Sequence, residues 1–376
     1  MADPAAWPLV SVIILNFNGK RWLEACLDSL AKSDYPRARY EVILGDNAST
    51  DDSVSFVRHH YSQVKVIVFE DNYGFCRSNN LCAKEALGDY LVFLNNDTSV
   101  TESWLSQLVQ GVLSEPSIVS CASKILFPPS EKGSCLNAAG GRIFITGSSI
   151  YEGWMQADGP QYNVLKYTGF GCAAGVLVQK KFFLETGGFD EYYFHSVEEM
   201  DLGWRAWLYG YKVLYVPSAV MVHSMGGTAS GGKGMTPTVL FLVLRNSLYF
   251  MVKNFEGATA LRGMALFLLK TLYTCGYALW TRNMPAFLAV GRAYLCFLKD
   301  LTKAFRARAL VRGKRRVSDH ALQELKILAG VRDVIQATFS GLRAQKKYSS
   351  KGLYESQDIM KLRTNKQGDI VFYQET

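Results

Sequence analysis

The sequence predicts an α/β fold: an open, largely parallel β-sheet flanked by helices, followed by a basic helical region. Two observations predict the sheet. Short β-branched apolar runs alternate with stretches whose apolar residues recur at helical spacing, and four of these runs end in Asn- and Asp-rich turns. The expected strands cover residues 10–15, 42–44, 64–69 and 90–94, and the expected helices cover residues 22–30, 54–59 and 79–86.

The later elements are expected to be more varied. Residues 120–236 predict short strands, a helix near residues 197–209, a last strand at 213–222 and a Gly-rich loop at 226–234. Beyond this loop, apolar runs studded with Lys and Arg extend to about residue 316. An amphipathic helix capped by Ser318 or Asp319 is expected from there to about residue 342, before a polar, mobile tail.

Charge divides the chain of 376 residues at about position 237. Residues 1–236 hold 18 Lys and Arg against 24 Asp and Glu, whereas residues 237–376 hold 23 against 9. The second region contains no run of about 18–20 uncharged apolar residues, so no ordinary membrane-spanning helix is predicted. Apolar, aromatic and basic residues interleaved in this way are typical of helices that lie in a membrane interface. Helices that simply pack on the first domain are the alternative, and the apolar runs argue against nucleic acid as the anionic partner.

The eight cysteines include no CxxC pair, so we expect free, buried thiols of a reducing compartment. Residues 1–8 have neither a basic start nor an apolar stretch, and nothing in them predicts secretion. The expected location is therefore cytoplasmic.

Polar turns follow four expected strands. They read NFNG at 16–19, GDNASTD at 45–51, EDNYGF at 70–75 and NND at 95–97. Any one of them is explained by the turn preference of Asn, Asp and Gly. Four at the carboxyl edge of one sheet, where ligands bind in open α/β folds, indicate a binding site.

These segments resemble a known family. SVIILNFNG, VILGDNASTDDS, NYGFCRSNN and GDYLVFLNND are similar to the donor-site segments of family 2 glycosyltransferases of the GT-A (Rossmann-like) fold. The stretch TGGFDEYYFHSVEEMDLGWRAWLYGYKVLYVPSAVMVH resembles the acceptor half, most like the rhamnosyltransferase-like subgroup of cell-surface polysaccharide biosynthesis. The resemblance covers about residues 9–255. It implies sugar transfer, with inversion, from a nucleotide-sugar donor (a UDP- or dTDP-sugar) to a hydroxyl, with rhamnose as the candidate sugar.

The resemblance implies a Mg²⁺ or Mn²⁺ site in the motif NND at residues 95–97, after the fourth expected strand. Asn95 replaces the first acid of the family's Asp-x-Asp motif, Asp97 is the remaining carboxylate, and His223 is expected to complete the metal or diphosphate site. One carboxylate plus water molecules suits Mg²⁺, and a metal there would stabilise the leaving diphosphate.

The resemblance also implies a donor pocket in which Asp46 accepts the ring N–H of a pyrimidine. The Gly-rich loop comes close to a phosphate-binding GxxxxGK[ST] motif, but Gly234 stands where a hydroxyl is required, which argues against a nucleotide hydrolase. The expected donor-binding residues are Asn16, Asn18, Asp46, Asn47, Gly74, Phe75, Arg77, Asn96, Lys233 and Arg245.

Transfer to a hydroxyl requires a group that removes its proton. Glu198, Glu199 and Asp201 stand at an expected helix start, where negative charge also stabilises the helix. By resemblance Glu199 occupies the position of the base, and Glu198 or Asp201 is expected to orient it. Trp204 and Arg205, on the same helix, are the expected acceptor-binding residues.

We therefore expect a catalytic domain over residues 1–236, with its donor half at about 9–110 and its acceptor half at about 120–236. A membrane-associating region is expected over 237–345 and the tail over 346–376. The resemblance implies a polyprenyl-pyrophosphate-linked glycan acceptor at the cytoplasmic face of the membrane, with Lys314, Arg315 and Arg316 expected to meet the leaflet. No QxxRW motif is present, so transfer is expected to be non-processive. The alternative is a catalytically inactive nucleotide-sugar-binding protein on the same fold.

Overall fold

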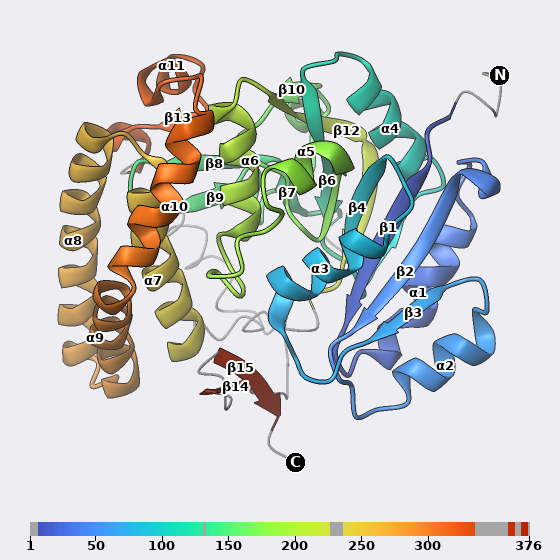
Figure 1. Cartoon of the computed structure of the whole chain (residues 1–376), viewed down its shortest axis with the longest axis horizontal. Helices are drawn as coiled ribbons and strands as arrows, with labels where there is room; N and C mark the ends of the chain where they lie inside the picture. The colour runs from blue at the N-terminus through green and yellow to red at the C-terminus, as the bar shows by residue number, and fades with distance from the viewer. Residues whose placement is uncertain (1–6, 131–132, 226–235, 335–359, 365–369, 375–376) are drawn as a thin grey trace.

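A curled ten-stranded sheet organises the computed structural model, which describes residues 7–130, 133–225, 236–334, 360–364 and 370–374. Its strand order is β10-β12-β6-β11-β4-β1-β2-β3, with β5 beside β12 and β7 beside β6 (Figure 1). The parallel strands of the first half are β1 (Val10–Asn16), β2 (Tyr40–Asp46), β3 (Lys65–Val68) and β4 (Tyr90–Asn95). The helices after β1, β2 and β3 are α1 (Lys20–Ala31), α2 (Ser53–His60) and α3 (Gly74–Glu85). The predicted alternation is confirmed, although α3 begins before its expected start at residue 79.

The second half of the sheet is mixed, as expected. Its strands are β5 (Thr98–Val100), β6 (Ile118–Leu126), β7 (Leu136–Ala139), β10 (Lys166–Tyr167), β11 (Gly175–Gln179) and β12 (Lys212–His223). Its helices are α4 (Trp104–Leu113), α5 (Lys180–Glu185) and α6 (Glu198–Leu208). Because β11 pairs antiparallel with both β4 and β6, it joins the two halves into one sheet.

Two smaller sheets accompany the main one. β13 (Leu328–Ala329), β8 (Gly141–Phe144) and β9 (Ser149–Tyr151) form one of them, and β14 (Met360–Thr364) and β15 (Ile370–Gln374) form the other. Regular structure thus occurs within the region that was predicted to be a mobile tail.

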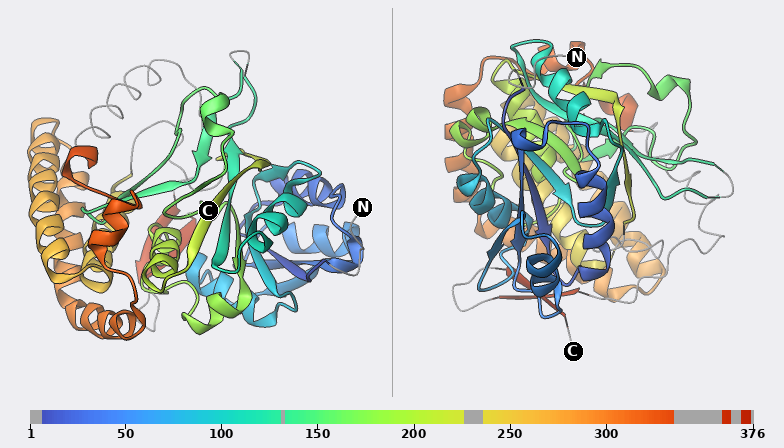
Figure 2. Two further views of the ribbon diagram at one scale, coloured as in Figure 1. Left: turned by 90° about the horizontal axis from the view of Figure 1, so that it is seen from above. Right: turned by 90° about the vertical axis from the view of Figure 1, so that its right-hand side faces the viewer.

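The sheet is followed by the helices α7 (Pro237–Asn254), α8 (Gly257–Trp280), α9 (Met284–Lys299), α10 (Leu301–Lys314) and α11 (Asp319–Glu324). In both figures α8 and α9 lie at the end of the molecule away from β1, β2 and β3 (Figures 1 and 2). α7 packs between them and the sheet, and its apolar residues join α3, α5 and α6 in one core cluster. The change of composition at residue 237 is therefore not a break in packing. None of the helices in the described ranges is long and apolar enough to cross a bilayer.

The prediction of one helix from residue 318 to about 342 is wrong. Ser318 caps α11 as expected, its hydroxyl accepting from the Ala321 N–H at 3.2 Å, but the helix ends at Glu324. The next residues turn back and Leu328 and Ala329 pair with β8, where both are buried.

The three basic residues expected on a leaflet also contact the protein body, although the Lys314 and Arg316 side chains are exposed. Lys314 donates to the Glu185 carbonyl oxygen at 2.6 Å, and Arg315 forms an ion pair with Asp319 at 2.9 Å. The Arg316 backbone N–H donates to the Leu208 carbonyl oxygen at 2.7 Å. This stretch is consequently a joint between α6, α10 and α11.

Candidate active site

The carboxyl ends of β1, β2 and β4 meet, as the sheet topology predicts. Asn16 and Asp46 are the paired last residues of β1 and β2, and the Asn16 Nδ2 donates to Asp46 Oδ2 at 2.9 Å. The Asn96 Nδ2, just beyond β4, donates to Asn16 Oδ1 at 2.8 Å. A Cβ on Gly19 would lie 2.1 Å from the Asn96 Nδ2, so only glycine permits this contact. Asn16 thus connects the first, second and fourth strand ends.

The Asp46 carboxylate is fully buried and its oxygens are occupied. Oδ1 accepts from the Ser49 N–H at 2.8 Å, and Oδ2 accepts from the Ser49 hydroxyl at 2.7 Å as well as from Asn16. Asn18 closes the same pocket, because its side-chain oxygen accepts from the Thr50 N–H at 2.7 Å. The turns after β1 and β2 therefore form one hydrogen-bonded unit.

Asn47, directly after β2, contacts α3, the helix that carries Gly74, Phe75 and Arg77. Asn47 is buried and accepts from the Ser78 hydroxyl. Gly74 has φ of +77°, and the Phe75 N–H donates to the Phe194 carbonyl oxygen at 3.0 Å. The Arg77 guanidinium lies over the Tyr73 ring, 4.2 Å from its centroid. The donor loop thereby touches the turn that precedes α6.

The turn after β4 meets the end of β12. His223 Nε2 lies 3.2 Å from Asp97 Oδ1 and 3.3 Å from Asn95 Nδ2. The Ser224 N–H donates to the Asp97 carbonyl oxygen at 2.9 Å, which ties the two segments together. Across the described ranges no group of three or more His, Cys, Asp and Glu side chains could hold a metal ion.

The turn before α6 is strained. Phe194, Ser196 and Val197 have φ values of 62°, 70° and 81°. The left-handed region is costly for a β-branched residue such as Val197, and it persists only where surrounding contacts enforce it. Such strain is often found at functional sites, and here it immediately precedes Glu198 and Glu199.

The Glu199 carboxylate is held from two sides. Its Oε2 accepts from the Ala173 N–H at 3.1 Å, and its Oε1 accepts from the Tyr151 hydroxyl. Burial and the neighbouring Glu198 raise the pKa of Glu199 to about 7, although these two hydrogen bonds lower it. Burial also raises the pKa of Glu198 to about 7. A carboxylate that titrates near neutral pH is suited to general-base catalysis.

Ala173 and Ala174 link the Glu199 carboxylate to the end of β4. The Ala174 carbonyl oxygen accepts from the Asn95 N–H at 3.0 Å, while the Ala173 N–H binds Glu199. The segment before β11 therefore places Glu199 beside the turn that carries Asp97. Neither Tyr151 nor Ala173 was predicted, because Tyr151 is 48 residues distant from Glu199 in sequence and no local pattern marks it.

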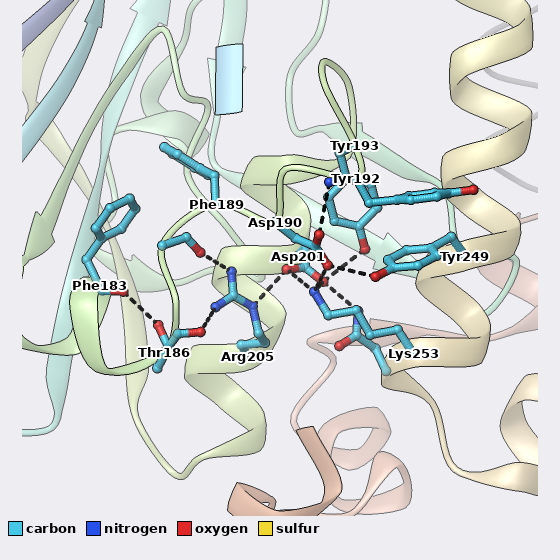
Figure 3. A network of polar contacts seen from close by, with 12 residues as sticks. Phe183, Thr186, Phe189, Asp190, Tyr192, Tyr193, Asp201, Arg205, Tyr249 and Lys253 are labelled. Atoms are coloured by element: carbon cyan, nitrogen blue, oxygen red, sulfur yellow. Dashed lines mark hydrogen bonds and ion pairs between the residues drawn. The ribbon is translucent and has the colours of Figure 1, made fainter. Parts of the chain in front are cut away.

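Asp201, Trp204 and Arg205 require correction. Asp201 has no exposed surface and pairs with the Arg205 Nε at 2.7 Å and the Lys253 Nζ at 2.9 Å, on opposite sides (Figure 3). Burial alone would raise the pKa of Asp201, but these two cations lower it to about 2. Asp201 thus ties α6 to Lys253 of α7 and stabilises the packing of these two helices. Trp204 is 0% exposed against Phe255, and Arg205 is 3% exposed, so neither can reach an acceptor.

Arg245 also differs from its predicted role. It is buried in α7, and its Nη2 donates to the Tyr192 carbonyl oxygen at 2.8 Å, so it stabilises the turn before α6 and is not presented to a donor. Lys233 lies outside the described residues.

The central sheet, its flanking helices and the polar strand ends define an α/β protein with the GT-A architecture. The family described as "Glycosyl transferase family 2" matches residues 11–133, which include β1 to β4 and the polar turns that follow them. The "O-antigen biosynthesis protein RfbC" of Myxococcus xanthus is 27% identical over 226 residues, which is 57% of this chain and 17% of that protein. The chain spans less than half the length of the curated relatives that it matches first.

Two solved structures share the fold. One is "GalNAc-T7 with UDP, GalNAc and Mn2+", with a TM-score of 0.52 and 19% identity, covering 66% of this chain and 50% of that chain. The other is "Mannosyltransferase PcManGT from Pyrobaculum calidifontis in complex with GDP-Man and Mn2+", with a TM-score of 0.51 and 17% identity, covering 79% of this chain and 89% of that chain. These likenesses concern the architecture.

Proposed function

We propose that this protein transfers a sugar from a nucleotide-sugar donor to an acceptor hydroxyl, with Glu199 as the general base. One observation carries the proposal: two consecutive residues bind Glu199 and Asn95. The Ala173 N–H donates to the Glu199 carboxylate, and the Ala174 carbonyl oxygen accepts from the Asn95 N–H. This arrangement brings a carboxylate of raised pKa beside the strand ends at which GT-A proteins hold their donors. The acceptor hydroxyl gives its proton to Glu199 as its oxygen attacks the anomeric carbon, and the bond from that carbon to the diphosphate breaks. A single displacement of this kind inverts the configuration.

The donor is proposed to occupy the Asn16, Asn18, Asp46 and Asn47 pocket, with Gly74, Phe75 and Arg77 along its side. A nucleobase N–H that binds Asp46 must share Oδ2 with, or replace, the Asn16 and Ser49 donors. A pyrimidine donor, UDP- or dTDP-linked, is proposed, because Asp46 offers an acceptor to a ring N–H.

Asp97 and His223 are proposed to hold Mg²⁺ or Mn²⁺. Their facing Oδ1 and Nε2 atoms are 3.2 Å apart, and the opposite ring atom, His223 Nδ1, is buried without a hydrogen-bond partner among the described residues. A carboxylate and an imidazole suit Mn²⁺, whereas Mg²⁺ favours oxygen ligands. Donor phosphates and water would complete the coordination beyond this pair. When bound, such an ion would stabilise the charge of the leaving diphosphate.

A thermal-shift panel tests the donor and the metal together. UDP-, dTDP- and GDP-sugars with Mn²⁺ should raise the melting temperature selectively, and EDTA should remove that shift. The Asp97→Ala variant should melt without a donor-dependent shift. A protein that gains nothing from any donor, or that transfers sugar fully in EDTA, would contradict the proposal.

The acceptor is proposed to be a polyprenyl-pyrophosphate-linked glycan that receives one or a few sugars, with rhamnose as the candidate. Its location would be the cytoplasmic face of the cell membrane. The α8–α9 hairpin, residues 257–299, supports this part. Apolar side chains that would normally be covered are at least half exposed on both of its helices: Leu261 at 72%, Tyr273 at 72%, Trp280 at 81%, Leu288 at 63% and Leu295 at 70%.

The charges of the hairpin support an anionic bilayer as its proposed partner. Its ionisable Lys, Arg, Asp and Glu residues are all cations: Arg262, Lys270, Arg282, Arg292 and Lys299. Apolar faces edged by cations bind membrane interfaces, and each cation near an anionic leaflet contributes about 1 kcal/mol before screening. A second copy of the chain would carry the same positive charge, which disfavours self-association through this face.

Vesicle co-sedimentation tests the hairpin. The whole protein should bind phosphatidylserine-containing vesicles more tightly than neutral ones, and salt should weaken most of that binding because exposed charges are screened beyond about 8 Å. Absence of binding to either vesicle, or dimerisation that buries the hairpin, would overturn the membrane assignment. The donor and metal experiment is independent of both results.

A further inference from the structure

One face of α7 carries the polar side chains that hold the turn before the candidate base. Arg245, Asn246, Tyr249 and Lys253 stand at i, i+1, i+4 and i+8, a spacing that places them on one side of a helix. All four are buried, at 5%, 0%, 3% and 5% exposure. Buried polar groups on an otherwise apolar helix are costly unless they are paired, so their partners indicate their purpose.

Three of these residues attach the beginning of the turn. Lys253 and Tyr249 bind Asp190 Oδ2 at 2.7 and 3.0 Å, and Tyr249 stacks on Tyr192 with ring centroids 3.9 Å apart (Figure 3). Arg245 then donates to the Tyr192 carbonyl oxygen at 2.8 Å. The chain is therefore fixed before it enters its left-handed residues.

Asn246 holds the strained part itself. Its Nδ2 lies 3.0, 3.0 and 2.8 Å from the carbonyl oxygens of Tyr193, His195 and Ser196. Its Oδ1 accepts from the Arg245 Nε and Nη2 at 3.0 and 2.8 Å. Because a guanidinium can only donate, Arg245 determines which way the amide points, and the amide N–H groups face the turn.

We propose that Asn246, oriented by Arg245, is a positioning residue for the reaction: it holds the turn at residues 193–197, in which Phe194, Ser196 and Val197 are left-handed, in the conformation that aims Glu199 at the acceptor. Three carbonyl oxygens that converge on one amide require the chain to curl around it. The curled turn ends at Val197, which has φ of 81°. It thereby places the Glu199 carboxylate where it accepts hydrogen bonds from Tyr151 and Ala173. The inference rests on the proposed role of Glu199.

The same turn is fixed on its other side by the donor loop. The Phe75 N–H donates to the Phe194 carbonyl oxygen at 3.0 Å, and a Cβ on Gly74 would lie 2.6 Å from the Phe194 ring. Asn246 and the donor loop thus enclose residues 193–197 between them. Loss of the Asn246 amide should release the turn on one side and leave the proposed donor-binding residues Asn16 and Asp46 unchanged.

Asn246→Ala and Asn254→Ala form a matched pair that tests the inference. Asn254 is also a buried asparagine of α7, but its Nδ2 donates to the Asp201 side chain at 2.7 Å and not to the turn. Both variants should lose stability. Only Asn246→Ala should accelerate hydrogen exchange of the amides of residues 193–199, lower kcat by about 10- to 100-fold through misplacement of the base, and leave the donor KM unchanged.

The pH profile adds a readout that stability alone would not move. The titratable groups that face Glu199 are Glu198, His195, Tyr151 and Cys172. If Glu199 moves away from this buried position, its pKa should fall from about 7 toward its usual value of 4.5. The acid limb of kcat should therefore shift to lower pH in Asn246→Ala but not in Asn254→Ala.

Asn246→Asp covers the case in which the alanine variant does not fold. It preserves the volume and the contact with Arg245 but cannot donate to the three carbonyl oxygens, so it should reproduce the kinetic and exchange effects. Wild-type exchange, kcat and acid limb in the folded Asn246 variants would overturn the inference. If the wild-type protein transfers no sugar, the proposed function fails instead. Hydrogen exchange then still tests whether Asn246 fixes the turn at residues 193–197.

Discussion

Helices α7 and α8 are alike in composition and opposite in use. Both combine long apolar runs with isolated cations, yet 13 of the 18 residues of α7 are buried against 5 of the 24 residues of α8. The cations of α7 bind carboxylates and carbonyl oxygens of the candidate active site, whereas Arg262 and Lys270 of α8 are exposed beside uncovered leucines. The comparison teaches that a basic apolar stretch has two possible purposes, internal positioning and external docking, which only the partners distinguish.

The largest expected effect lies at Lys253, the internal cation. Lys253→Ala leaves the buried Asp201 with one cation, Arg205, and takes a partner from Asp190. Breaking a buried charge pair typically costs about 3–5 kcal/mol, and we expect a loss of that size in urea-unfolding free energy. Lys299→Ala, at an exposed position of α9, should change it by less than about 0.5 kcal/mol. Equal effects would erase the distinction between the two helical regions.

The next effect concerns the side chain that α7 is proposed to aim. Glu199→Gln keeps the shape and the acceptor oxygen but cannot take a proton, so kcat should fall by about 10²-fold or more. The donor-dependent melting shift should remain, because Asp46 and Asp97 are unchanged. If Glu198→Gln is the inactive variant and Glu199→Gln is active, the neighbouring buried carboxylate is the base.

The pH dependence follows from the raised pKa of Glu199. As a base it must be ionised, so kcat should rise with pH through about 7. Stability should move the other way: burial favours the protonated form, so the contribution of this group is full below its usual pKa of 4.5 and is lost as pH rises through about 7. Glu199→Gln should therefore lose less stability than the wild type between pH 5 and 7. An equal loss in both would show that Glu199 is not buried in its neutral form.

Sequence reasoning correctly brought the polar strand ends together, and it failed around α6 for a physical reason. Asn16, Asp46 and Asp97 stand directly after apolar strands, and parallel strands bring their ends together without further information. The role of Asp201 depends on Lys253, which is 52 residues away, and the turn before α6 depends on Asn246, 50 residues from Ser196. Neither distance leaves a periodic signal. The spacing of Arg245, Tyr249 and Lys253 could have indicated a polar stripe on α7, but it could not have named its partners.

The smallest expected effect tests the external side of the comparison. Leu268 and Leu272 are 49% and 58% exposed on α8. If the hairpin docks on a bilayer, docking is the step that removes their exposed surface from water. Leu268→Ser with Leu272→Ser should weaken binding to anionic vesicles by about 1 kcal/mol for each leucine, roughly 30-fold together. The unfolding free energy should hardly change, because these side chains contribute little to the core.

The matched control places the same change elsewhere. Leu87 and Leu113 are 73% and 53% exposed in the first half of the chain, and serine at both should leave vesicle affinity unaltered. A stability loss from the α8 pair would mean that these leucines are covered by protein. Equal weakening by both pairs would mean that the protein binds vesicles through general hydrophobicity, so that α8, like α7, has no external partner of its own. Weakening by the α8 pair alone, with unchanged donor-dependent melting, would separate the docking helix from the positioning helix.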